Sequence, residues 1–97
     1  SFVVSYLTTT GDVGKNPAIY IDAADVIHVV AYDEVNQKII YFNNQYGDFD
    51  TYTFEAVNYG YGTYNGLTMD STGVLHIGTY SENLGGILLY SFDPDNI

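Results

Sequence analysis

Two aspartates and two histidines recur at the same spacing along this chain. Asp22 and Asp70 lie 48 residues apart, as do His28 and His76, so each aspartate precedes a histidine by six residues. An imidazole can carry a proton near neutral pH or bind a metal, and a carboxylate can act as a catalytic acid or base. No second histidine, cysteine or carboxylate stands at ligand spacing on the same segment. The pattern therefore favours buried, hydrogen-bonded histidines and turn-capping aspartates, with metal binding or catalysis as the alternative.

The segment NYGYGTYN, residues 58–65, has the most unusual local composition. Aromatic faces beside amide, hydroxyl and carboxyl groups suit sugar rings, and loops on a rigid scaffold often carry binding residues. Alternatively, the tyrosines wedge between structural units and the glycines permit the backbone turns. The candidate ligand-binding residues are Tyr59, Tyr61, Tyr64, Asn65, Asp33 and Asn36.

The last turn, DPDN, offers oxygen ligands for calcium from Asp93, Asp95 and Asn96. A solvated turn is the interpretation that we favour, and calcium is the alternative. The segment GDVGKN lacks the spacing of a phosphate-binding loop, and no catalytic motif stands elsewhere. We predict a non-catalytic protein without a cofactor.

The charge balance excludes several classes of partner. Twelve acidic residues against two lysines give a net charge of -10. Affinity for nucleic acid and for anionic membrane surfaces depends on lysine and arginine, so we expect neither partner. No apolar run approaches the roughly 20 residues that cross a bilayer, so we expect no membrane insertion. The many tyrosines and glycines, with few basic residues, are typical of secreted or cell-surface β-proteins.

The elements that position these residues form an internal repeat, found by setting residues 16–42 over 64–90. The repeat positions include Tyr32 and Tyr80, and a copy of this length rarely folds without neighbours. One extra residue between Ser81 and Gly86 would also match Tyr41 with Tyr90. The identical positions of the first copy are Asp22, Val26, His28, Tyr32, Glu34 and Ile39.

Eight short segments have strand composition, and no segment shows a sustained helical period. The first unit has Phe2–Leu7, Ala18–Asp22, Val26–Tyr32 and Lys38–Asn43, and the second has Thr51–Ala56, Gly66–Asp70, Val74–Tyr80 and Gly86–Phe92. Turn-forming residues separate them. The sequence predicts a single all-β domain over residues 1–97.

Continuous apolar runs distinguish between all-β architectures. Val26–Tyr32 is apolar at nearly every position, and Ile39–Phe42 and Ile87–Tyr90 behave alike, so both faces of each sheet should be covered. This favours two four-stranded β-propeller blades, at about 17–56 and 65–92, over a single eight-stranded β-sandwich. Two blades cannot close a ring. We therefore expect a homo-oligomer, most simply a six-bladed trimer, in which strand 2–7 completes a blade of a neighbouring chain.

The segments IDAADVIHVVAYDEVNQKIIYF and MDSTGVLHIGTYSENLGGILLYSF resemble the D-x-x-G-x-x-H repeats of sialidase-like bacterial β-propellers. The first copy carries Asp25 where the second has Gly73, and aspartate tolerates left-handed backbone angles. The two-blade length is similar to that of small trimeric fucose-binding lectins. Those lectins bind sugar with tryptophan and arginine, which this chain lacks, so their binding residues have no counterpart here.

These resemblances imply a multivalent module that binds a carbohydrate or another polar ligand. The alternatives are a structural or protein-interaction ring, a fragment of a larger propeller, or a glycoside hydrolase. The hydrolase is disfavoured because sialidase-like sites use an arginine cluster, and the chain has no arginine.

Overall fold

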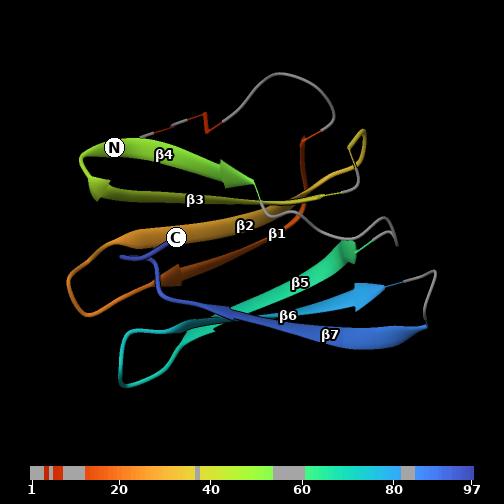
Figure 1. Cartoon of the computed structure of the whole chain (residues 1–97). Coiled ribbons are helices and arrows are strands. Elements are labelled where there is room, and N and C mark those ends of the chain that lie inside the picture. Colours follow the sequence, from red (N-terminus) through yellow and green to blue (C-terminus); the bar gives the residue numbers. More distant parts are fainter. Residues whose placement is uncertain (1–3, 5, 8–12, 37, 54–60, 82–84) are drawn as a thin grey trace.

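The computed structural model describes residues 4, 6–7, 13–36, 38–53, 61–81 and 85–97, and these contain strands and turns but no helix. Two antiparallel sheets form the molecule, one with the order β1-β2-β3-β4 and one with the order β5-β6-β7 (Figure 1). The all-β prediction is confirmed in this form. The strands are β1 (Val13–Ile21), β2 (Ile27–Asp33), β3 (Lys38–Tyr46), β4 (Asp48–Thr53), β5 (Tyr61–Met69), β6 (Leu75–Ser81) and β7 (Gly86–Phe92).

Seven of the eight predicted strands overlap these elements, and the β7 bounds agree at both ends. β1, β4 and β5 begin three to five residues earlier than predicted. The predicted strand Phe2–Leu7 falls largely outside the described residues; its described members Val4, Tyr6 and Leu7 belong to no strand of the single chain. Its proposed place in a neighbouring chain stays a prediction.

The register of the two sheets repeats with a constant offset of 48 residues. His28 pairs with Asn43 across β2 and β3, and His76 pairs with Ser91 across β6 and β7. Tyr41 therefore corresponds to Leu89, and the expectation of one extra residue between Ser81 and Gly86 is wrong. Side chains alternate between the faces of a strand, so a match of Tyr41 with Tyr90 would place equivalent side chains on opposite faces.

Each sheet has a face that carries its histidine, here called the His face, and an opposite face. The His face of the first sheet packs against the opposite face of the second. β5 makes most of this contact, approaching β1 most closely and also reaching β2 and β3. The buried core residues are Val30, Ile39 and Tyr41 from the first sheet and Leu75 and Ile77 from the second.

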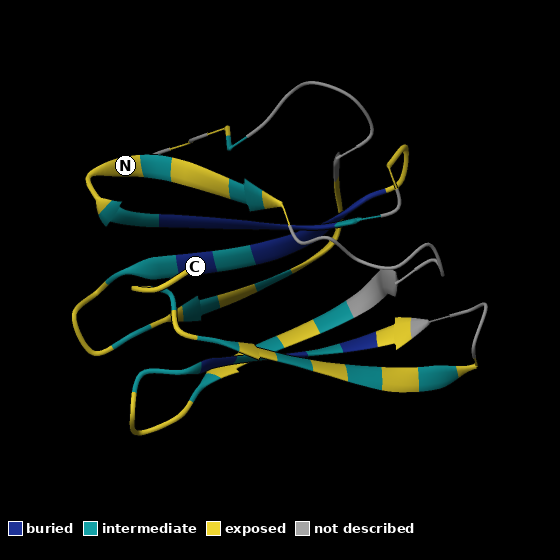
Figure 2. Cartoon of the chain, viewed as in Figure 1, coloured by how far each residue is buried: buried dark blue, intermediate teal, exposed yellow. Residues whose placement is uncertain are grey.

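Burial differs between the two sheets, as Figure 2 shows. β2 and β3 are buried on both faces over most of their length, which agrees with their continuous apolar runs. β7 alternates between half-buried and exposed residues, so in the single chain its His face is open to solvent. The run Ile87–Tyr90 is thus covered on one face only.

Candidate functional site

Each copy of the repeat contains an aspartate-capped turn. Asp22 Oδ1 accepts hydrogen bonds from the amides of Ala24 and Val26, at 2.9 and 3.0 Å. Asp25 has a φ of 63°, and its counterpart Gly73 has a φ of 87°. Asp25 thus adopts the left-handed conformation expected from the alignment, and the aspartate at the start of the turn fixes the path into β2.

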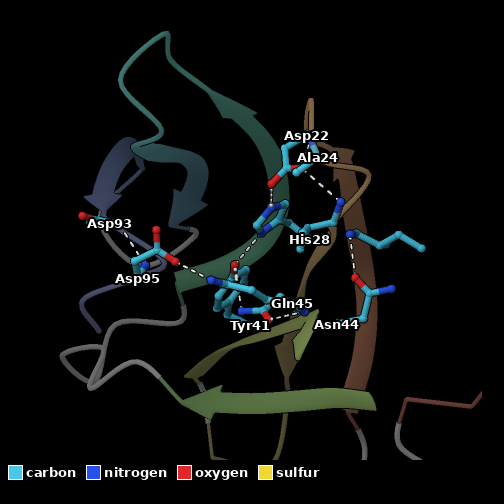
Figure 3. Close-up of polar contacts among 11 residues, drawn as sticks. Asp22, Ala24, His28, Tyr41, Asn44, Gln45, Asp93 and Asp95 are labelled. Atoms are coloured by element: carbon cyan, nitrogen blue, oxygen red, sulfur yellow. Dashed lines mark hydrogen bonds and ion pairs between the residues drawn. The ribbon is translucent and has the colours of Figure 1, made fainter. Parts of the chain in front are cut away.

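In the first sheet, this turn is tied to β3 through His28 (Figure 3). His28 Nε2 lies 2.8 Å from Asp22 Oδ2, and His28 Nδ1 lies 2.5 Å from the Tyr41 hydroxyl. Because the carboxylate can only accept, we assign the hydrogen to Nε2, so Nδ1 accepts from Tyr41. Asn43 Nδ2 donates to the same hydroxyl at 3.2 Å. Every polar atom of the imidazole has a partner, which explains how His28 is buried to 1% exposure.

The electrostatics agree with a structural network. Burial raises the pKa of the Tyr41 hydroxyl to about 12, so it remains protonated. Burial also acts to raise the pKa of Asp22, but hydrogen bonds from His28, Val26 and Ala24 outweigh it and leave that pKa lowered. A charged Asp22 and a neutral Tyr41 form the ground state of this chain of hydrogen bonds.

The second sheet repeats the pair in a more open setting. His76 Nε2 lies 2.8 Å from Asp70 Oδ2, and Ser91 Oγ lies 2.8 Å from His76 Nδ1. The side chains of His76 and Asp70 are 30% and 40% exposed. The hydrogen bond from His76, followed by that from Thr72, lowers the pKa of Asp70. These residue types also occur in hydrolytic triads, but each stands at the place of a structural residue of the first sheet, so we interpret them as structural.

A pocket lies where the two sheets meet, at the end that carries the aspartate turns. It has a volume of about 460 Å³ and is called the junction pocket below. Gln45 Nε2 donates to Asp95 Oδ1 across it, which links the first sheet to the C-terminal segment (Figure 3). The Asp95 amide in turn donates to Asp93 Oδ1 at 2.9 Å. The pocket-lining residues used below are Asp22, Val26, Gln45, Met69, Gly73 and Asp95.

The sequence-predicted ligand residues lie elsewhere. Asp33 caps the β2–β3 turn by accepting from the amides of Val35 and Asn36, and from Asn36 Nδ2 at 2.8 Å. These bonds, above all the one from the Asn36 side chain, lower the pKa of Asp33. Asn65 Nδ2 donates to the Asn16 carbonyl at 3.1 Å and so joins β5 to β1. Asp33 and Asn36 lie at the end of the first sheet opposite to Asp22.

Two of the three candidate tyrosines lie in strand β5. Tyr59 lies outside the described residues, and only the strand position of Tyr61 and Tyr64 in β5 is described. Tyr61 pairs with Ser81, at the end of β5 remote from Asp70. The aromatic ligand site stays a prediction.

The predicted calcium ligands also have local partners, because the Asn96 amide donates to the Asp93 carbonyl at 3.0 Å. Within the described part of the chain, no three histidine, aspartate or glutamate side chains are grouped as metal ligands. Calcium binding stays the alternative prediction for this turn. No helix in the same part of the chain is long and apolar enough to cross a membrane.

Sequence reasoning missed Gln45, Tyr41 and Asn43. The signal that could have found Tyr41 and Asn43 was the constant offset, which aligns them with Leu89 and Ser91 and shows where the copies diverge. Comparison with models of protein families, with curated proteins and with solved structures found no match.

Proposed function

We propose that this chain is a pair of β-propeller blades that binds a small polar ligand without catalysis, with carbohydrate as the first candidate. The observation that carries the proposal is the junction pocket between two sheets related by an internal repeat. The pocket offers the polar groups of Gln45 and Asp95 beside the apolar side chains of Val26 and Met69. This combination suits a sugar, which has hydroxyl groups around an apolar ring face.

The stacking of the sheets supports the propeller architecture. The first sheet is a four-stranded antiparallel meander, and the second stacks on it with β5 closest to β1, as the inner strands of adjacent blades would. The second sheet has three strands among the described residues, which leaves room for an outer strand beside β7. Residues 2–7 of a neighbouring chain are our candidate for that strand.

Propellers typically have 4–8 blades, so two blades imply a ring of several copies. Three chains would give six blades. A ring presents the same pocket several times, and this avidity raises the affinity for a clustered ligand such as a surface glycan. A secreted or cell-surface location would suit such a module.

The lowered pKa values of Asp22 and Asp70 argue against either of them as a catalytic acid. A glycosidase needs a carboxylic acid whose pKa is raised, so that it can donate a proton to the leaving group. Asp22 and Asp70, which begin the two turns at the junction, both have lowered pKa values. Their role is to hold the turns.

A protein-interaction ring is the second candidate function, favoured by apolar side chains exposed at the β2–β3 and β3–β4 hairpin ends, where Val35 is 70% and Tyr46 is 75% exposed. Such a ring would use its surface, rather than a pocket, to recruit a partner.

A glycan array, followed by titration of the best glycan, tests the proposal. Gln45→Ala and Asp95→Ala should each weaken binding roughly tenfold, because each removes a polar contact worth on the order of 1.4 kcal/mol. Asp50→Ala, at an exposed position of β4, is the matched control and should bind as the parent does. Loss of binding in Tyr61→Ala alone would instead place the ligand at the opposite end of the sheets. A folded ring that binds no glycan would favour the interaction ring.

A further inference from the structure

The open face of the second sheet is built from the same positions that the first sheet buries. With the constant offset of 48 residues, Ile39 corresponds to Ile87 and Tyr41 to Leu89. Ile39 and Tyr41 are 0% exposed, whereas Ile87 is 81% and Leu89 is 70% exposed. The second sheet packs on the first pair, with Leu75 and Ile77 in the same buried cluster. The second sheet has an apolar His face of the same construction, and no further sheet among the described residues covers it.

The complementary surface is also present on the chain. Within the molecule, β5 is the strand that packs on the first His face, and it does so with Leu67 and Met69. The counterparts of these residues on β1 are Ile19 and Ile21, which lie on the opposite face of the first sheet. They are 63% and 55% exposed. On the neighbouring strands β2 and β3, the residues Ala31, Ile40 and Phe42 of the same face are already buried. The exposed part of this face is therefore β1, the strand that would make the contact.

The shape of the open His face fits a side chain from outside. Gly66 and Gly78 lie directly opposite each other, where the first sheet has Ala18 and Val30. A Cβ atom placed at either glycine would meet no other atom within 4 Å, apart from its chain neighbours. Together with Ile87 and neighbouring residues they line a hollow of about 350 Å³. The hollow is large enough to take a branched apolar side chain such as isoleucine.

We infer that the His face of the second sheet, formed by Gly66, Gly78, Tyr80, Ile87 and Leu89, binds β1 of a second copy of this chain through Ile19 and Ile21. The contact repeats between chains the packing that joins the two sheets within one chain. It is head-to-tail, because the two surfaces differ, and such contacts form a ring when the rotation closes. This inference rests on the proposed propeller and identifies the surfaces that would assemble it.

Association also has to overcome charge. Each chain carries a net charge of -10, so copies repel one another at low ionic strength. Apolar contact is insensitive to salt at moderate concentration, whereas the repulsion is screened. Association through the proposed surfaces should therefore strengthen as sodium chloride is added.

The first experiment measures the mass of the chain in solution by light scattering and native mass spectrometry. We expect a closed assembly, most simply three chains. Ile87→Asp and Ile19→Asp should each abolish it, because each places a charge in the apolar contact. Val35→Asp makes a similar change at a position that is 70% exposed on the β2–β3 turn, and should leave the mass unchanged. A single-chain mass for the parent at all salt concentrations would overturn the inference.

The second experiment mixes the two disrupted variants. Ile87→Asp retains an intact β1 surface, and Ile19→Asp retains an intact His face, so a head-to-tail contact predicts a complex with one chain of each. If the contact were between two identical faces, one variant alone would still form a dimer and the mixture would give nothing new. A mass of the parent that rises with protein concentration without reaching a limit would indicate an open chain of copies. This result would agree with the two proposed surfaces but contradict the closed ring. Glycan binding is scored separately, because the junction pocket lies within one chain.

Discussion

The two sheets share a backbone register and an aspartate–histidine pair, yet one pair is buried and the other is open to solvent. His28 is 1% exposed, whereas the side chain of His76 is 30% exposed. The difference follows from stacking order, since the second sheet covers the first His face and no sheet in the described part of the chain covers the second. The same pair therefore contributes differently to the stability of the two sheets. The neighbouring residues also differ, since the first sheet has Tyr41 and Asn43 where the second has Leu89 and Ser91.

Exchanging Tyr41 for its counterpart residue should have the largest effect. The ring of Tyr41 contacts that of Phe92 edge-on and stacks on that of Tyr52, with ring centroids 4.9 and 5.7 Å apart. Its hydroxyl is hydrogen-bonded to His28 and Asn43. Tyr41→Leu should lower the free energy of unfolding by about 3–5 kcal/mol, measured by urea denaturation. Tyr41→Phe keeps the ring and should cost about 1–3 kcal/mol. Equal costs for the two variants would contradict a contribution from aromatic packing.

Removing the histidines tests the comparison directly. His28→Ala leaves a cavity and strips partners from Tyr41, so it should destabilise the fold by about 2–4 kcal/mol. His76→Ala should cost less than about 1 kcal/mol in the single chain, because solvent can replace its partners. Both are measured in an Ile87→Asp background, which is expected to keep the chain single. Equal costs of His28→Ala and His76→Ala in the single chain would remove the distinction between the two sheets. In the assembled parent the cost of His76→Ala should rise, because a second copy covers it.

Acid should weaken both aspartate–histidine pairs. The pKa values of Asp22 and Asp70 are lower in the folded chain than their ordinary value. Carboxyl groups of this kind add stability above their unfolded pKa of about 4, and this contribution is lost as the pH falls through the folded pKa. Unfolding by urea should therefore become easier below about pH 4 and vary little from pH 5 to pH 7 for these groups.

The contribution of each carboxyl group to this pH dependence is measured with Asp22→Asn and Asp70→Asn. Asp70 is the more exposed partner, at 40% against 15% for Asp22, so burial opposes the lowering of its pKa less than it does for Asp22. Asp70→Asn should therefore flatten the acid limb of the stability curve more than Asp22→Asn. The reverse order would show that solvent screening of the exposed pair outweighs the cost of burying Asp22.

The sequence predicted what depends on local composition. Continuous apolar runs identified strands such as β2 and β7, and the recurrence of Asp22 and His28 identified the repeat. The alignment of the two copies wrongly matched Tyr41 with Tyr90 because the two residues are of the same type. The face of the strand on which each side chain lies is fixed by the register of the hairpin, which a comparison of residue types does not show. The junction pocket was missed because Asp22, Gln45 and Asp95 are brought together by sheet stacking across most of the chain. Contacts at such separation leave no periodic signal.

The turn residues should produce the smallest difference. Asp25 and Gly73 occupy the same left-handed position, and a Cβ atom placed at Gly73 would have no atom within 4 Å apart from its chain neighbours. Gly73→Asp should therefore cost less than about 1 kcal/mol, because aspartate adopts this conformation readily and the cost is backbone strain alone. Gly73→Val is the matched control and should cost about 2 kcal/mol, since a branched side chain is strongly disfavoured there. Thermal unfolding distinguishes the two, and a similar loss for both would mean that the second turn, unlike the first, requires glycine itself.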